Sequence, residues 1–131
     1  MARNLSLQII SKLAPADLKK VAERDFQDAV LAYAKDQGWK CHWMRRNAMV
    51  NQKGEWHPLG SAGFPDVLAA RWTGVPHASP VEVVALELKA ERGQVTPEQE
   101  DWLLTLAHVS GVKQAMVAKP RDAATVMQLL E

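Results

Sequence analysis

Apolar residues recur at helical spacing in three stretches of the chain, and they run together or alternate with polar residues in four shorter ones. The first helical stretch begins with Pro15, which suits the first turn of a helix, and the glycines Gly38 and Gly111 follow two of the stretches as stops. The predicted helices are residues 15–37, 96–110 and 122–130, and the predicted strands are residues 39–44, 66–72, 81–89 and 113–118.

This order, a helix, three strands, a helix, a strand and a helix, predicts an α/β fold. The first three strands can form a meander, and the helix at residues 96–110 provides a crossover to a parallel fourth strand. We therefore expect a single domain over residues 1–131, with a small mixed sheet of about four strands flanked by helices. Residues 1–13 are expected to form an N-terminal arm, as a short strand or helix, and residues 47–63 a polar turn or loop.

The strand predicted at residues 81–89 carries Glu87 and Lys89 near the end of an apolar run. Residues two apart in a strand point to the same face, so these two charges project together. Burying an unpaired charge is costly, so a partner is expected at this position. Asp66 begins a neighbouring strand after the proline-containing turn at residues 63–65, and it reaches the same place if the two strands are antiparallel.

Two carboxylates and a backbone carbonyl, from Asp66, Glu87 and Leu88, form a set of oxygen ligands that suits Mg²⁺ or Mn²⁺. Lys89 beside them can orient or deprotonate a water molecule and offset negative charge in a phosphate transition state. The structural alternative is an ion pair between an acid and Lys89 at the end of a strand. The bare acid-x-Lys spacing favours that ion pair, whereas the added Gly-Phe-Pro-Asp segment favours a metal site.

The composition is that of an ordinary globular domain, with 47% hydrophobic and 24% charged residues. The single cysteine, Cys41, excludes an internal disulfide and a cysteine-rich zinc cluster, and the four scattered histidines show no zinc-ligand spacing. No apolar run approaches the roughly 18 residues of a membrane span, and the N-terminus lacks the pattern of a signal peptide. We therefore expect no membrane association and an intracellular, cytoplasmic location.

Charge is unevenly distributed along the chain, although the net charge is only +1. Residues 1–60 hold ten Lys and Arg against six Asp and Glu, and residues 61–131 hold six against nine. A basic half can contact phosphates while an acidic half holds a cation, although scatter among solvated side chains can also give this difference.

Basic residues surround the segment between the first two strands and are candidates for DNA binding, with Trp43 and Trp56 among them to stack on a base. His42 is expected to point inward from its strand. The alternative is a solvated loop whose tryptophans pack on the core. The basic candidates are His42, Arg45, Arg46 and Lys53.

Asp66 and the Glu87-Leu88-Lys89 triplet resemble the core of the PD-(D/E)xK nuclease superfamily. With Gly63-Phe64-Pro65 before Asp66, and Thr96-Pro97-Glu98-Gln99 at a helix start, the string is similar to the VRR-NUC (virus-type replication-repair nuclease) domain in its stand-alone phage and bacterial form. The resemblance spans about residues 21–118. It implies a restriction-endonuclease-like core and a Mg²⁺- or Mn²⁺-dependent endonuclease. It also implies a homodimer that cuts branched DNA such as Holliday junctions, leaving 5′-phosphate and 3′-hydroxyl ends.

The resemblance adds residues from the first helix to the candidate site. Glu23 and Gln27 lie on one stripe at the rim of the apolar face of this helix. The family carries a glutamate here, often followed by a glutamine four residues later, that faces the metal site. This implies Glu23 as a catalytic residue that ligates a second metal ion or the water around the first, and Gln27 as a contact to water or a DNA phosphate. Partial exposure of both side chains is the structural alternative.

Gln99 has two compatible interpretations. Thr96 and Gln99 have the spacing of a capping box, in which each side chain bonds to the backbone of the other residue at the start of a helix. Gln99 also shares the inward helix face with Leu103, and the resemblance implies a catalytic-site glutamine at this position. Arg92, which follows the strand with Lys89, is a further candidate for DNA binding.

Three other functions fit the same residues. A nuclease of this type can cut flaps or ends without preferring junctions. A non-catalytic module of the same fold can bind DNA without turnover. An ordinary structural protein can carry an ion pair at a strand end.

Overall fold

The computed structural model describes residues 5–44, 48–50, 56–58 and 62–131, with only the backbone of the two short middle segments. The helices are α1 (Leu7–Ile10), α2 (Pro15–Leu18), α3 (Glu23–Asp36), α4 (Pro97–Ala107) and α5 (Ala123–Leu130), with a 3₁₀ turn, η1 (Pro120–Asp122), before the last. The strands are β1 (Lys40–Trp43), β2 (Ala48–Val50), β3 (Trp56–Pro58), β4 (Val67–Trp72), β5 (Val81–Leu88) and β6 (Val112–Ala118).

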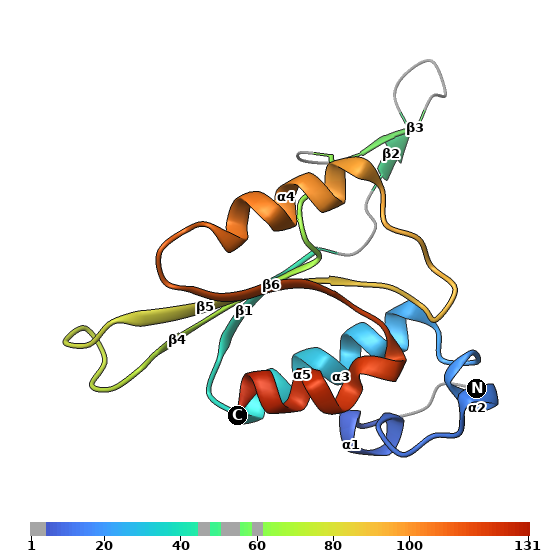
Figure 1. The fold of residues 1–131 in the computed structure, drawn as a ribbon, viewed down its shortest axis with the longest axis horizontal. Coiled ribbons are helices and arrows are strands. Elements are labelled where there is room, and N and C mark those ends of the chain that lie inside the picture. The colour runs from blue at the N-terminus through green and yellow to red at the C-terminus, as the bar shows by residue number, and fades with distance from the viewer. Residues whose placement is uncertain (1–4, 45–47, 51–55, 59–61) are drawn as a thin grey trace.

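Four of the strands form one mixed sheet in the order β1-β4-β5-β6. β1 and β5 both pair with β4 in antiparallel fashion, and β6 pairs in parallel with β5 after α4 crosses over. β2 and β3 form a separate antiparallel pair, which extends away from this sheet (Figure 1). The expected α/β class, with a small mixed sheet flanked by helices, is confirmed.

The helices cover the two faces of the sheet unequally. α1, α3 and α5 lie on one face, and α4 lies on the other (Figure 1). The main core is on the first face, where Phe26 of α3, Leu130 of α5 and Leu86 of β5 are all fully buried. α4 packs mainly over β6 and β5, and among its residues only Leu103 is buried. The second face is therefore thinly covered.

The alternation predicted for residues 81–89 is present in β5. Val84, Leu86 and Leu88 belong to the core on the α3 and α5 side of the sheet. Glu87 and Lys89 point to the side of α4, where the Gln99 side chain bonds to Glu87. Because successive residues of a strand point to opposite faces, β5 has an apolar face toward the core and carries its charged residues on the other face, as expected.

The helix predicted at residues 15–37 is wrong in one respect, because it is two helices, α2 and α3, separated by residues 19–22. The amides of Lys20 and Val21 bond to carbonyls three residues back, and Ala22 is extended, so the helical ladder stops. Val21 is 4% exposed and packs in the core. Burial of this side chain offsets the lost helical bonds.

Two other segments are better defined than the sequence pattern indicates. The strand or helix expected within residues 1–13 is the helix α1, whose Leu7 and Ile10 are buried in the core. The segment expected to be a polar turn or loop contains the β2 and β3 pair.

Arg71 of β4 joins four separate parts of the chain. Its guanidinium donates to the carbonyl oxygens of Gln37, at 2.9 Å, and Glu131, at 2.8 Å, and pairs with Glu82 at 3.0 Å. The same group lies 4.3 Å from the ring centroid of Trp39, whose indole N–H donates to the Leu130 carbonyl at 2.8 Å. The end of α3, the strands β4 and β5, and the end of α5 are therefore fastened at one point.

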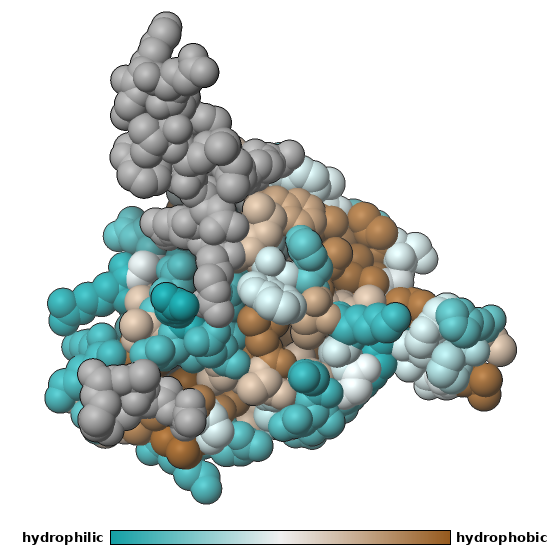
Figure 2. Space-filling view, turned by 180° about the vertical axis from the view of Figure 1, so that it is seen from behind, coloured by the Kyte–Doolittle hydropathy of each residue, from teal (hydrophilic) through white to brown (hydrophobic). Residues whose placement is uncertain are grey.

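Apolar residues are interspersed with hydrophilic ones on the face shown in Figure 2. Within the described residues, no helix has both the length and the apolar character needed to span a membrane.

Candidate active site

Asp66 reaches the end of β5, as expected for antiparallel strands. It directly precedes β4, whose first residue Val67 is paired with Leu86. The Leu88 amide donates to Asp66 Oδ2 at 3.1 Å. The preceding residue, Pro65, is buried, which holds the start of the strand in place. The chain therefore brings Asp66 and Glu87 together although 20 residues separate them.

The side chains of Glu87 and Lys89 are buried next to each other, beside Asp66. Lys89 Nζ lies 3.5 Å from Glu87 Oε2, and the two side chains are 3% and 2% exposed. Burying both side chains in their charged forms would be expensive, and one contact of this length would not satisfy all of their hydrogen-bonding groups. An ion pair here would therefore be incompletely satisfied.

Gln99 caps its helix, as expected, and it also contacts Glu87. Its Oε1 accepts from the Thr96 amide at 2.9 Å, while Thr96 Oγ1 accepts from the Gln99 amide at 3.1 Å, completing a capping box. Its Nε2 donates to Glu87 Oε2 at 3.0 Å. The first turn of α4 is thereby tied to the carboxylate of β5.

The other oxygen of this carboxylate, Glu87 Oε1, is buried and has no hydrogen-bond donor among the described groups. Burial, then the nearby Asp66 charge and a hydrogen bond with Asp66, raise the pKa of Glu87 to about 8, and Lys89 acts in the opposite direction. Two carboxyl groups bond to each other only if one holds a proton. Near neutral pH and without a cation, the Glu87 carboxyl is therefore protonated.

These groups fit a hard divalent cation. The site offers two adjacent carboxylates, one of them with an oxygen that lacks a donor, and such oxygens are the ligands that Mg²⁺ and Mn²⁺ prefer. A bound cation would favour the ionised form of Glu87 and satisfy Oε1. The residues that could hold it are Asp66 and Glu87, with the carbonyl of Leu88 next to them.

The turn at residues 63–65 packs directly on α4. Gly63 has φ +86°, and a Cβ there would lie 2.5 Å from the Glu98 carbonyl carbon, so only glycine fits. The Phe64 and Trp102 rings meet edge to face with centroids 4.9 Å apart. The sequence analysis did not predict this aromatic pair. The available signal was Gly63 next to Phe64, since a glycine beside an aromatic residue is typical of a tightly packed turn.

A second contact holds the turn after Lys89. The Glu91 carboxylate accepts from the Arg121 backbone amide at 2.8 Å and from Arg121 Nε at 3.2 Å. The Arg121 guanidinium also donates to the Glu91 carbonyl at 3.2 Å. The turn is therefore fastened to η1. Sequence analysis also missed this pair, because the two residues are 30 apart and carry no local pattern.

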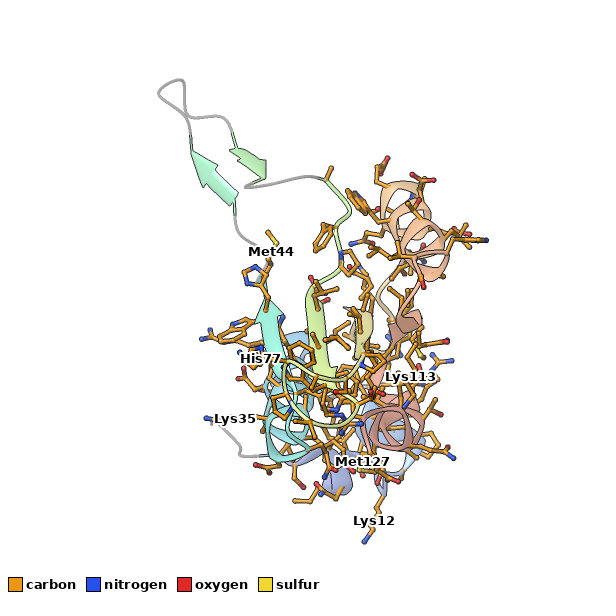
Figure 3. All side chains as sticks on the ribbon, turned by 90° about the vertical axis from the view of Figure 1, so that its left-hand side faces the viewer. Lys12, Lys35, Met44, His77, Lys113 and Met127 are labelled. Atoms are coloured by element: carbon orange, nitrogen blue, oxygen red, sulfur yellow. The ribbon has the colours of Figure 1, made fainter. Side chains whose placement is uncertain are left out.

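Gln27 and Glu23 come from α3. Gln27 is 5% exposed and donates to the Met44 carbonyl at 3.1 Å, so it bonds the helix to the end of β1, where Figure 3 shows Met44. Glu23 is the first residue of α3 and is half-buried. Among the described residues, no group of three or more acids, histidines or cysteines could hold a metal ion, so Glu23 is not gathered with Asp66 and Glu87.

The basic candidates for DNA binding have mixed outcomes. The expectation that His42 points inward is wrong: it is exposed, because β1 is an edge strand and α4 packs mainly over β6 and β5. Arg92 is exposed in the turn after β5. Arg45, Arg46 and Lys53 lie outside the described residues.

Comparisons with protein-family models, with curated proteins and with solved structures found no match to this chain. Its function must therefore be argued from the site itself.

Proposed function

We propose that this protein is a metal-dependent endonuclease that hydrolyses phosphodiester bonds in DNA. The observation that carries the proposal is the buried Glu87 carboxyl, which shares the end of β5 with Asp66 and Lys89 and has one oxygen without a donor. A metal ion and a phosphate would complete this arrangement. The resemblance of these residues to the PD-(D/E)xK nucleases gives the reaction.

A purely structural ion pair accounts for the site less well. Such a pair needs one acid and one base, whereas here a second acid lies close enough to raise the pKa of the first. In the ionised form of Glu87, a buried oxygen without a donor would cost about 1–3 kcal/mol. Costs of this kind are typical of functional sites, where a ligand removes them.

Each residue has a role in the proposed reaction. Asp66, Glu87 and the Leu88 carbonyl would hold Mg²⁺ or Mn²⁺, which when bound neutralises charge on the phosphate and activates water. Lys89 would donate a hydrogen bond that positions the attacking water, and Gln99 would keep the Glu87 carboxylate in place. Water adds to phosphorus, the P–O3′ bond breaks, and the 3′ oxygen takes a proton.

Other parts of the proposal come from the resemblance. Glu23 would ligate a second ion or the water around the first, and Gln27 and Arg92 would contact water or DNA. The preferred substrate would be branched DNA, and the active form would be a homodimer in the cytoplasm of a bacterial or phage-infected cell.

The test is incubation with Mg²⁺ or Mn²⁺ and a panel of end-labelled DNAs: a four-way junction, a flap, a duplex and a single strand. We expect cleavage that is lost in Asp66→Ala while DNA binding is retained. Glu100→Ala, which removes an exposed carboxylate from α4, is the matched control and should cleave normally. Cleavage that survives Asp66→Ala would overturn the proposal, and binding without any cleavage would indicate a non-catalytic module.

A further inference from the structure

Among the described residues, α4 packs mainly over β6 and β5 and leaves β1 and β4 open on the sheet face that carries the candidate site. On this face the register places Lys40 beside Ala70 and His42 beside Leu68, and Trp72 lies two residues beyond Ala70. Lys40 and His42 are exposed, and the three β4 residues are half-buried. We call these five residues, Lys40, His42, Leu68, Ala70 and Trp72, the open strip.

The open strip is continuous with the candidate site. Asp66 lies two residues before Leu68, so alternation places both on the same face of the chain that becomes β4. From Asp66 to Trp72 is six residues, a length of roughly 20 Å at the rise of a strand. The strip therefore leads from the two acids to the far end of the sheet.

A hollow lies at that far end. Its volume is about 290 Å³, and Lys40, Trp72 and Val81 are among the residues that line it. The Trp72 ring also meets the His77 ring, with centroids 5.1 Å apart. An ammonium group and an aromatic ring thus line one hollow.

Charge along this face changes from acidic to basic. Asp66 and Glu87 lie at one end, where a cation fits, and the exposed amine of Lys40 lies toward the other. Glu82 of β5 points to the opposite face, where it pairs with Arg71. The strip therefore suits a polyanion that extends from a phosphate held at the two acids.

We propose that the open strip binds a single-stranded stretch of DNA adjoining the scissile phosphate, with phosphates near Lys40 and His42 and a base against Trp72. This inference rests on the proposed nuclease function and deepens it. A base stacks on an aromatic side chain only when its face is free, which a continuous duplex does not allow. The preferred substrate is then a branch with a single-stranded arm, such as a flap, rather than a closed four-way junction.

The test is fluorescence anisotropy in EDTA, with a labelled single strand of roughly 10 nucleotides. Trp72→Leu should weaken binding about tenfold, and Trp72→Phe, which keeps a ring, should restore most of it. Lys40→Ala should lower the slope of log affinity against log salt by about 0.7. Lys35→Ala is the matched control, because Lys35 extends from α3 into solvent (Figure 3).

The outcomes separate this inference from the nuclease proposal. The proposal that the open strip binds DNA would be overturned if Trp72→Leu and Lys40→Ala both kept wild-type affinity. It would also be overturned if Lys35→Ala lost as much affinity as they do. A loss in Trp43→Leu instead of Trp72→Leu would also overturn it, because Trp43 faces the other side of the sheet. The nuclease proposal fails only if metal-dependent cleavage is absent or independent of Asp66. Melting temperatures of all variants establish that each is folded.

Discussion

At the scale of single residues, Glu87 explains most of the chemistry of the site. It is 2% exposed, it adjoins a second acid, and one of its oxygens lacks a donor. Burial, then the charge of Asp66 and a hydrogen bond with it, raise the pKa of this carboxyl to about 8 against the opposing effect of Lys89. The same carboxyl would be ionised in a metal complex, so protons and cations compete for it.

The raised pKa predicts how stability depends on pH in EDTA. Between its ordinary pKa of 4.5 and about 8, Glu87 holds a proton in the folded state that the unfolded chain has released. Raising the pH through this window therefore lowers the free energy of unfolding, and the effect ends above about pH 8. We expect the melting temperature of the wild type to fall relative to Glu87→Gln from pH 5 to pH 8. A constant difference between the two proteins would contradict the raised pKa.

Gln99 allows the capping role to be separated from the catalytic role. Gln99→Ala and Thr96→Ala should each lower stability by about 0.5–2 kcal/mol, because each removes half of the capping box. Only Gln99→Ala also removes the bond to Glu87 Oε2, so it alone should reduce the cleavage rate beyond its effect on stability. Urea unfolding and single-turnover cleavage measure the two effects. Equal cleavage rates would show that Gln99 acts only as a cap.

At the scale of elements, the site depends on how the turn at residues 63–65 meets the first turn of α4. The turn at residues 63–65 leads into Asp66 and β4, and the first turn of α4 carries Gln99. Close backbone contact at Gly63 and the Phe64–Trp102 pair hold the two together. The Gly-Phe-Pro-Asp segment is thus explained by packing as well as by chemistry.

Gly63→Ala should destabilise the protein by about 2–4 kcal/mol, because it combines a left-handed backbone conformation with a collision against the Glu98 backbone. Cleavage should fall as well, since α4 must shift. Gly74→Ala is the matched control: its added Cβ would meet Ser79 Cβ at 3.3 Å. Thermal unfolding compares the two, and a similar small loss in both would contradict the tight contact at Gly63.

At the scale of the whole molecule, Arg71 connects the ends of the fold. It bonds to the backbone after α3 and at the end of α5, and it pairs with Glu82. We expect Arg71→Ala to cost about 2–3 kcal/mol, because several carbonyls lose a charged donor and the Trp39 ring loses its cation. Lys113→Ala, which removes one bond to the Leu129 carbonyl, should cost less than 1 kcal/mol, about the value of an exposed bond. Urea midpoints of the two variants test this difference.

Local patterns predicted the parts of the fold that depend on neighbours along the chain. The alternation in β5 and the antiparallel pairing of β4 were enough to bring Asp66 to Glu87. The break before α3 could not be predicted, because it depends on the burial of Val21 among distant side chains. The exposure of His42 likewise depends on where α4 lies across the sheet, which no local pattern contains.

The thin attachment of α4 has a consequence for the order in which the protein opens. With Leu103 as its buried residue, α4 loses little apolar contact on detaching, whereas β5 is held between β4 and β6 over the main core. Native-state hydrogen exchange should therefore find α4 amides exchanging through a local opening, well before those of β5. Such an opening would hydrate Glu87 without unfolding the sheet, and water would reach the carboxyl by fluctuation of one helix. Equal protection of α4 and β5 would show instead that the molecule opens only as a whole.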